Sequence, residues 1–163
     1  MEVPEVRLIV PYARIIPEVR SALPPTAEWV DVSTSDDAYY NLLSDLWAAR
    51  EGFLLVEQDI VPPPLMLPEL AACPAPWCAC GYEFENLSLL YGLGCVKFGA
   101  ELMAQVPNAW DMVAQQRTQE HPAKHWCRLD DNLKAVLGRR GIHSHHHGTV
   151  RHLSTVRSHQ PCH

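Results

Sequence analysis

The chain has 163 residues and a mass of 18.4 kDa, and its 47% apolar and 20% charged residues are typical of one globular domain. Its net charge of -6 argues against a nucleic-acid-binding protein, because that affinity comes mainly from Lys and Arg. No stretch approaches the roughly 18 to 20 apolar residues that span a bilayer, and residues 1–5 lack the start of a secretion signal. We therefore expect a soluble, cytoplasmic protein without a membrane span.

Six cysteines lie between positions 73 and 162. A chain of this length does not need disulfides for a stable core, and no secretion signal is expected, so free buried thiols are favoured. The first three lie close together, but their spacing is not the paired C-x2-C of a structural zinc site, and zinc is not favoured there. The six are Cys73, Cys78, Cys80, Cys95, Cys127 and Cys162.

The first third of the chain alternates between strand-like and helix-like segments. Short apolar runs predict strands over 6–10 and 28–33, with one or two helical turns between them at 18–22. From 37 to 50 the apolar residues recur at helical spacing, and Gly52 is the expected stop. This alternation builds a parallel sheet with helices packed against it, so the sequence predicts an α/β fold.

The third strand is predicted over 52–61, and it carries two acids. A short apolar run that glycine opens and three prolines close is typical of a buried strand that stops abruptly. Successive side chains of a strand point to opposite faces, so Glu57 and Asp59 are expected on one side and Gln58 on the other. Two carboxylates are costly to bury without partners, so this strand end is either solvated or holds a cation.

Three loops are expected to meet at one edge of this sheet. In open α/β sheets, ligands bind at the carboxyl ends of the strands. Pro11 and Tyr12 follow the first predicted strand, and Asp36 and Asp37 follow the second. Together with the acids of 57–59, these loops form the predicted binding site.

The middle of the chain continues with a helix predicted over 65–70 and strands over 75–80 and 95–98. The segment Gly92-Leu93-Gly94 precedes the last of these strands, and a Gly-x-Gly pair alone favours a tight turn over a phosphate-binding loop. The polar, Gln-rich segment 108–124 is predicted as a loop with a little helix, placed to act as a flexible lid.

A second acid pair, Asp130 and Asp131, opens a predicted amphipathic helix that ends at Gly138 or Gly141. Capping and the helix dipole both favour Asp at a helix start, so capping is the simplest role for this pair. A catalytic role requires further support.

The segment 143–152 holds five histidines. If it is extended, His143, His145 and His147 share one face, and an H-x-H pair has metal-ligand geometry. The alternative is a solvated surface tract that binds metal weakly. Imidazole with carboxylates suits Mn, Zn, Ni or Fe, so the histidines and the acids of 57–59 complement each other as ligands.

In their order along the chain, these motifs resemble those of GT-A fold glycosyltransferases of family 2. Glu57-Gln58-Asp59 resembles the D-x-D metal motif with Glu in the first place, and Val10-Pro11-Tyr12 is similar to the first strand and nucleotide-binding loop. Gly92-Leu93-Gly94 is similar to the acceptor-side strand, and Asp130-Asp131 resembles the Glu-Asp motif with Asp in place of Glu. The small chain resembles glycosyltransferase-like proteins of phage genomes.

The resemblance implies a single GT-A-like domain over 1–163, with a nucleotide-binding half at 1–61 and an acceptor half with a His-rich tail at 62–163. It implies transfer of a sugar from a nucleoside diphosphate sugar, with a UDP-sugar expected, to an acceptor hydroxyl. The implied cofactor is Mn²⁺ or Mg²⁺. The acceptor and the oligomeric state stay open.

The resemblance also implies roles for single residues. Asp59 is the expected direct metal ligand and Glu57 a direct or water-mediated one, and a late histidine completes the metal site. That histidine is His145, His147 or His152. Asp131, or failing that Asp130, is the expected base. The expected contacts of the nucleotide sugar are Pro11, Tyr12, Asp36, Asp37, Glu57, Gln58, Gly92 and Gly94.

Two other functions fit the same residues. One is a non-catalytic, His-rich protein that stores or senses Ni or Zn, and the other is a degenerate GT-A domain that binds a partner without turnover. The metal-storage function predicts tight metal binding without nucleotide. A transferase predicts weak metal binding until a nucleoside diphosphate adds its phosphate oxygens as ligands.

Overall fold

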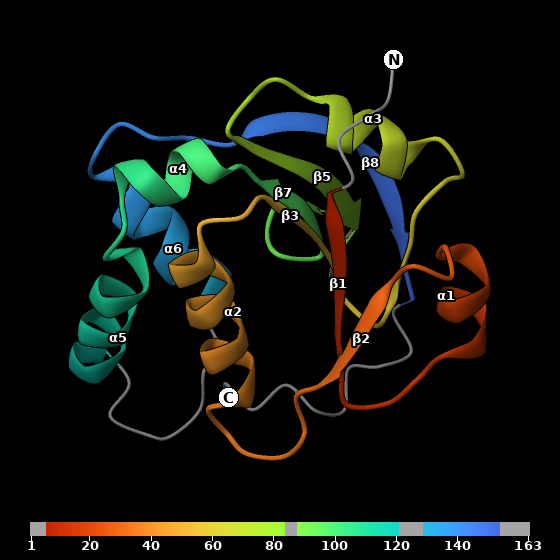
Figure 1. The fold of residues 1–163 in the computed structure, drawn as a ribbon, viewed down its shortest axis with the longest axis horizontal. Coiled ribbons are helices and arrows are strands. Elements are labelled where there is room, and N and C mark those ends of the chain that lie inside the picture. The colour runs from red at the N-terminus through yellow and green to blue at the C-terminus, as the bar shows by residue number, and fades with distance from the viewer. Residues whose placement is uncertain (1–5, 84–87, 121–128, 154–163) are drawn as a thin grey trace.

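The computed structural model describes residues 6–83, 88–120 and 129–153, which form a sheet with helices on both faces (Figure 1). Within these described ranges, no helix is long and apolar enough to cross a lipid bilayer. In chain order the elements are β1 (Arg7–Tyr12), α1 (Pro17–Ala22), β2 (Glu28–Asp31), α2 (Ala38–Ala49), β3 (Phe53–Val56), β4 (Ile60–Val61), α3 (Met66–Ala72), β5 (Trp77–Glu83), β6 (Leu89–Leu90), β7 (Cys95–Phe98), α4 (Ala100–Gln105), α5 (Ala109–Glu120), α6 (Leu129–Gly138) and β8 (His145–His152).

The strands form an eight-stranded sheet in the order β2-β1-β3-β7-β5-β8-β4, with β6 paired to β5. β1 is parallel to both β2 and β3, so that Ile9 lies between Glu28 and Leu55. β7 runs antiparallel to β3 and β5, whereas β8 is parallel to β5. The predicted α/β fold is confirmed, with a parallel first half and a mixed second half.

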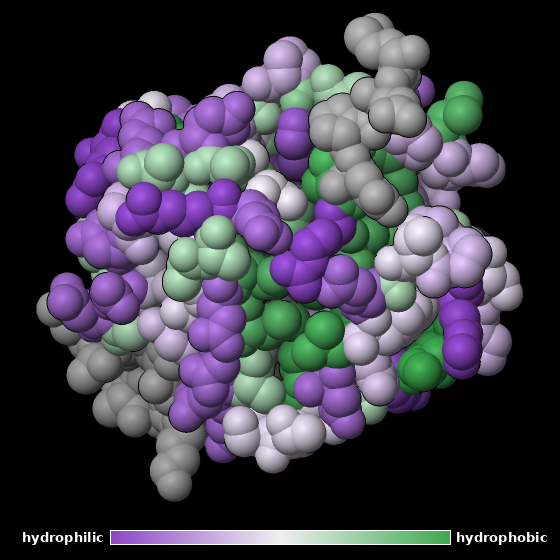
Figure 2. Space-filling view, viewed as in Figure 1, coloured by the Kyte–Doolittle hydropathy of each residue, from purple (hydrophilic) through white to green (hydrophobic). Residues whose placement is uncertain are grey.

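Alternate residues of the central strands face two separate helix layers. One face, which includes Ile9 and Leu55, packs against α2, α4, α5 and α6. The other face, which includes Val10 and Leu54, packs against α1 and α3. A strand covered on both faces is apolar throughout, as in Phe53–Val56. Figure 2 shows hydrophobic residues near the middle of this side of the molecule, beside β1 and β2, with mainly hydrophilic residues over the helices to the left.

The acidic segment divides the predicted third strand in two. β3 ends at Val56, and a turn follows, in which the Ile60 N–H donates a hydrogen bond of 3.1 Å to the Glu57 carbonyl oxygen. The prediction of one strand over 52–61 is therefore wrong, because β4 leaves the line of β3 and pairs with β8 instead. The positions of Glu57 and Asp59 depend on this turn and not on strand alternation.

Most of the predicted lid is a packed helix. Trp110 of α5 lies edge-on to Trp47 of α2, with ring centroids 6.2 Å apart, and its carbonyl oxygen accepts a hydrogen bond of 2.8 Å from the Tyr40 hydroxyl. The lid prediction is therefore wrong over 109–120, where a few buried residues anchor a mostly polar helix. Residues 121–124 of the predicted lid lie outside the described residues.

α2 ends at Ala49, with Arg50 as its C-cap residue, and does not extend to Gly52. Arg50 has a φ of 56°, in the left-handed region that commonly ends helices, and its N–H donates a hydrogen bond of 3.1 Å to the Trp47 carbonyl oxygen. The expected stop at Gly52 is therefore wrong, because the helix is already capped at Arg50.

The histidine-rich segment forms β8, as an extended segment parallel to β5. His145 lies beside Cys78 and His147 beside Cys80, and the register then shifts so that Gly148 is an extra residue. Such a β-bulge resets the alternation of side chains along the strand. His152 therefore emerges on the same face of the sheet as His145 and His147.

Candidate functional site

An acidic cluster forms where β3 ends. The Glu57 N–H donates a hydrogen bond of 2.9 Å to the Gly94 carbonyl oxygen, which holds the turn against the segment that leads into β7. Asp130, in the first turn of α6, brings a third carboxyl close enough for its charge to act on Glu57, as does that of Asp59. Two neighbouring acids and a third that is distant in the sequence therefore share one site.

The Glu57 side chain is partly accessible to solvent, but protein atoms surround its carboxyl group. This burial, followed by the negative charges of Asp59 and Asp130, raises the pKa of Glu57 from 4.5 to about 8, and the nearby Tyr39 hydroxyl partly offsets the rise. Without a cation, Glu57 is therefore mostly protonated at neutral pH. A bound cation would favour its ionised form.

Two tyrosines border the cluster. The buried Tyr39 hydroxyl lies near Glu57, yet within the described part of the chain it has no hydrogen bond of acceptable geometry. Burial, followed by the charges of Glu57 and Asp130, raises the pKa of Tyr39 and, in the same way, that of Tyr82 at the end of β5. Both phenols stay protonated and can donate to a ligand oxygen.

Gly92 and Gly94 make room for this arrangement. A Cβ at Gly92 would collide with the Asp130 carboxyl and lie 3.0 Å from the Tyr82 hydroxyl. A Cβ at Gly94 would lie 2.6 Å from the Tyr82 ring. The Gly-x-Gly pair is thus required for the close packing of Asp130 and Tyr82.

Asp59 contacts His152 of β8. The Asp59 Oδ2 and His152 Nε2 atoms lie 2.9 Å apart, and the Asp59 carbonyl oxygen accepts a hydrogen bond of 2.8 Å from the Leu153 N–H. The hydrogen bond with Asp59 raises the pKa of His152, although burial opposes the rise. His152 also lines a surface groove with a volume of about 670 Å³. The end of β8 is therefore tied to the acidic turn.

The other two predicted metal-ligating histidines lie elsewhere. The His145 Nδ1 atom lies 3.3 Å from the Cys78 sulfur, and the His147 Nε2 atom lies 3.5 Å from a Glu69 carboxylate oxygen. Of the three candidate histidines, the structure brings only His152 to the acidic turn. His145 and His147 are too far along β8 to share a ligand with it.

Gln58 positions the loop that follows β1. Its Oε1 atom accepts hydrogen bonds from the Ala13 N–H at 2.6 Å and the Arg14 N–H at 3.1 Å. The amide oxygen of Gln58 is therefore engaged by the protein's own backbone, and the predicted contact of Gln58 with the nucleotide sugar stays a prediction. Gln58 acts on the site by holding this loop beside the acidic turn.

The remaining predicted residues lie at the ends of β1 and β2. Pro11 is buried in β1, whereas Tyr12 is half-buried, with its ring centroid 5.9 Å from that of Trp29. Asp36 and Asp37 are exposed in the turn that leads into α2. Their contacts with a nucleotide sugar stay a prediction.

Of the two candidates for the base, Asp130 lies against the cluster. Asp131 is exposed, and its N–H donates a hydrogen bond of 2.9 Å to the Asp130 Oδ1 atom. Burial, followed by the charge of Asp131, raises the pKa of Asp130. Asp130 is the acid of this pair that packs beside Gly92 and Tyr82, and the identity of the base stays a prediction.

Sequence reasoning did not identify Tyr39 and Tyr82. The sequence position of Tyr39 could have pointed to the site, because Tyr39 lies in the first turn of the helix that follows the predicted ligand-binding loop after the second strand. Tyr82 had none, because it lies beyond the strand predicted over 75–80, and β5 in fact runs to Glu83.

The residue types of the acidic cluster suit a hard divalent cation. Carboxylate oxygens with one imidazole, as Glu57, Asp59 and His152 offer, form a set that Mn²⁺ accepts, and Mg²⁺ accepts the oxygens together with water. Among the described residues, no three ligand atoms of this cluster lie within 4.8 Å of one another, so a bound cation would have to draw the side chains closer. A cation would neutralise the nearby acids, whose charges are, after burial, the next cause of the raised Glu57 pKa.

Comparison with known proteins shows the fold. No protein-family model matches the chain, and no curated protein matches it in sequence. A glycosyltransferase involved in the glycosylation of the major capsid of PBCV-1 superposes on it with a TM-score of 0.55, at 10% identity, over 96% of this chain and 97% of that chain. The chain has a glycosyltransferase-like α/β fold.

A weaker similarity links the chain to a protein assigned as a glucose-1-phosphate thymidylyltransferase from Bacillus anthracis, solved in complex with sucrose. It covers 87% of this chain and 67% of that chain, at 8% identity and a TM-score of 0.43. Only the first similarity is strong enough to assign a fold, and membership of family 2 stays a prediction.

Proposed function

We propose that this chain is a metal-dependent glycosyltransferase that moves a sugar from a nucleoside diphosphate sugar, a UDP-sugar above all, to an acceptor hydroxyl. The observation that carries the proposal is the meeting of Glu57, Asp59, Asp130 and His152 at the end of β3, within a glycosyltransferase-like fold. These residues come from three separate parts of the sequence, and a cluster of closely placed acids is costly unless a ligand uses it.

Asp59 and His152 are the central metal ligands in this proposal, with Glu57 as a third. A bound Mn²⁺ or Mg²⁺ supplies Lewis-acid stabilisation of the charge that develops on the leaving diphosphate. His152 binds a metal only as neutral imidazole, so binding displaces the proton that Asp59 helps to retain. Glu57 likewise loses its proton, so metal binding tightens as the pH rises.

Asp130 is the proposed base of an inverting transfer. Its carboxylate accepts the proton of the acceptor hydroxyl while the acceptor oxygen bonds to the anomeric carbon and the bond from that carbon to the diphosphate oxygen breaks. A raised pKa suits this role, because a base that is effective near neutral pH must hold the proton it takes. The Tyr39 and Tyr82 hydroxyls are placed to donate hydrogen bonds to the sugar or the diphosphate.

The nucleotide is proposed to lie along the ends of β1 and β2. There the half-buried Tyr12 ring offers a surface for stacking, and Asp36 and Asp37 can accept hydrogen bonds from base or ribose. Gln58 keeps the loop after β1 in place, and Gly92 and Gly94 let Asp130 and Tyr82 pack closely against the segment that leads into β7.

A thermal-shift experiment with Mn²⁺ alone, uridine diphosphate alone and both together tests the proposal. We expect the pair to raise the melting temperature by more than the sum of the separate shifts, because the phosphates complete the metal coordination. The Asp59→Asn variant is the control and should lose the extra shift. No extra stabilisation of the wild type by the pair would contradict the proposal.

A further inference from the structure

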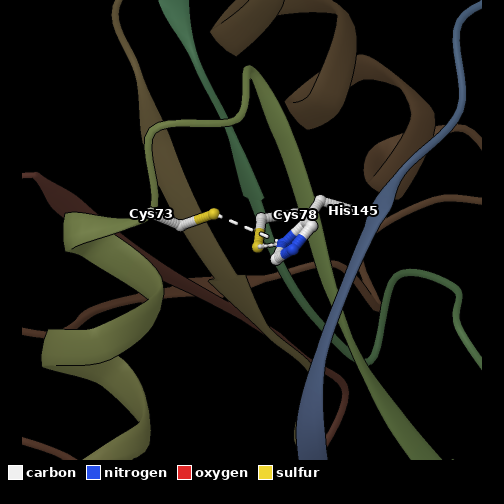
Figure 3. A group of neighbouring side chains, drawn as sticks. All are labelled: Cys73, Cys78 and His145. Carbon is white, nitrogen blue, oxygen red and sulfur yellow. Dashed lines mark hydrogen bonds between the residues drawn. The ribbon is translucent and has the colours of Figure 1, made fainter.

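Two cysteines and one histidine meet at a second site, away from the acidic cluster. Cys73 directly follows α3, Cys78 lies on β5 and His145 begins β8. Figure 3 shows both sulfur atoms directed toward the imidazole ring. One ligand atom from each residue lies within 4.8 Å of the other two.

The spacing of these atoms matches the edges of a tetrahedral metal site. The His145 Nδ1 atom lies 3.5 Å from the Cys73 sulfur and 3.3 Å from the Cys78 sulfur. In tetrahedral zinc, with Zn–S bonds of about 2.3 Å and Zn–N bonds of about 2.05 Å, the sulfur and nitrogen ligands lie about 3.6 Å apart. One ring nitrogen thus faces two sulfurs at almost the separation that a shared zinc ion imposes.

We propose that Cys73, Cys78 and His145 bind one Zn²⁺ ion, with a water molecule in the fourth position. Two thiolates and one imidazole form a soft ligand set that favours zinc over Mn²⁺ or Mg²⁺. The site is therefore distinct in metal preference from the oxygen-rich acidic cluster. It stands whether or not the chain transfers sugars.

Burial and charge around the site agree with three protein ligands and one open position. Cys73 and Cys78 are buried, whereas His145 is exposed, so the ion would lie at the surface with one side toward water. The Lys97 ammonium group donates a hydrogen bond to the Cys73 carbonyl oxygen. Its positive charge therefore lies near the two thiols and would add to that of the zinc ion in stabilising their thiolate forms.

The two proposed metal sites lie at opposite ends of β8. His145 begins the strand and His152 ends it, a separation of about 20 Å at a rise of about 3.3 Å per residue. A zinc ion would join α3, β5 and β8, which already meet through packing, strand pairing and the contact of His147 with Glu69. Its expected effect is to stabilise the strand that carries His152.

Cobalt provides the test, because Co²⁺ replaces Zn²⁺ and its thiolate complexes absorb in the near ultraviolet. The reduced full-length protein, freed of metal with a chelator, is titrated with Co²⁺ and then with Zn²⁺. We expect one Co²⁺ per chain with thiolate-to-cobalt absorption, loss of that absorption when Zn²⁺ is added, and a higher melting temperature with Zn²⁺. The Cys78→Ser and His145→Gln variants should lose the absorption, and His145 is exposed, so its replacement should not disturb folding.

Two matched variants show whether the signal comes from this site. Cys80→Ser replaces a neighbouring thiol whose hydrogen-bond partner is Cys95, and Asp59→Asn alters the acidic cluster. Both should keep the absorption. Absence of thiolate absorption in the wild type, its retention in His145→Gln, or its equal loss in Cys80→Ser would overturn the proposal, as would a Cys73–Cys78 disulfide in freshly purified protein without metal.

Discussion

The ionisation of Glu57 depends strongly on the residues around it. The same side chain on a solvated strand end would be an ordinary acid, yet burial beside Asp59 and Asp130 raises its pKa to about 8. The alternation of side chains along a strand suggested the pairing of Glu57 with Asp59. It gave no indication of Asp130 or Tyr39 as neighbours, because these come from helices whose packing the local pattern does not encode.

This raised pKa predicts how stability depends on pH. The folded pKa of about 8 lies above the ordinary value of 4.5, so folding favours the protonated form. The stabilisation is complete below about pH 4.5 and is lost as the pH rises toward about 8. Urea unfolding should therefore show a steeper fall in the free energy of unfolding between about pH 5 and about pH 8 in the wild type than in Glu57→Gln.

His152 changes stability in the same direction, because its pKa is raised as well, and both proteins in this comparison retain it. The difference between wild type and Glu57→Gln therefore isolates Glu57. Identical pH profiles for the two proteins would show that the carboxyl is not buried as described.

Measurements of kcat can distinguish the roles of Asp130 and Asp131. We expect Asp130→Asn to reduce kcat by about 100-fold or more, since a general base contributes that much, while binding of Mn²⁺ with uridine diphosphate is retained. Asp131→Asn is the matched control, because Asp131 is exposed and contacts Asp130 through its backbone N–H. A larger loss of kcat in Asp131→Asn would return the base role to Asp131.

Among the secondary-structure elements, β8 does most to define both candidate metal sites. Its bulge after His147 sets which later histidine shares a face with His145, and its pairing with β4 brings His152 to Asp59. The sequence indicated an extended histidine segment with ligand spacing. It did not distinguish His145, His147 and His152, because that choice depends on a register shift and on which strand β8 pairs with.

The segment that leads into β7 can be tested through its glycines. Gly92→Ala places a Cβ against the Asp130 carboxyl and the Tyr82 hydroxyl, so we expect a loss of about 1–3 kcal/mol in stability from overpacking, together with weaker binding of Mn²⁺ with uridine diphosphate. Gly138→Ala, at the end of α6, is the control.

At Gly138 an added Cβ would meet only the His143 ring, at 3.8 Å. Alanine also favours a helix over glycine, so Gly138→Ala should leave stability unchanged or slightly raised. Chemical unfolding of both variants makes this comparison. An unchanged stability and unchanged binding in Gly92→Ala would show that the packing around Asp130 is looser than described.

α5 shows where a local pattern is insufficient. Its Gln-rich sequence lacks a strong apolar stripe, and it was predicted as a lid, yet Trp110 and Val113 are buried against neighbouring helices. Tertiary packing and not intrinsic pattern determines this helix. The movement expected of a lid is therefore not a property of 109–120.

The whole molecule combines a parallel half, predicted from the alternation of strands and helices, with a mixed half that the sequence did not predict. The order of β7, β5 and β8 brings Cys73, Cys78 and His145 together from segments 67 and 72 residues apart. The spacing of the neighbouring cysteines in the sequence did not favour a zinc site. The third ligand is visible only once β8 is placed beside β5.

Turnover of a nucleotide sugar tests the central proposal most directly. A panel of nucleoside diphosphate sugars is incubated with wild type and Asp59→Asn, with Mn²⁺ or with a chelator, and release of the nucleoside diphosphate is measured. We predict release by the wild type that requires Mn²⁺ and falls by about 100-fold or more in Asp59→Asn, at an unchanged circular dichroism spectrum. Equal release by the two proteins, or equal release with chelator and with Mn²⁺, would contradict the proposed function.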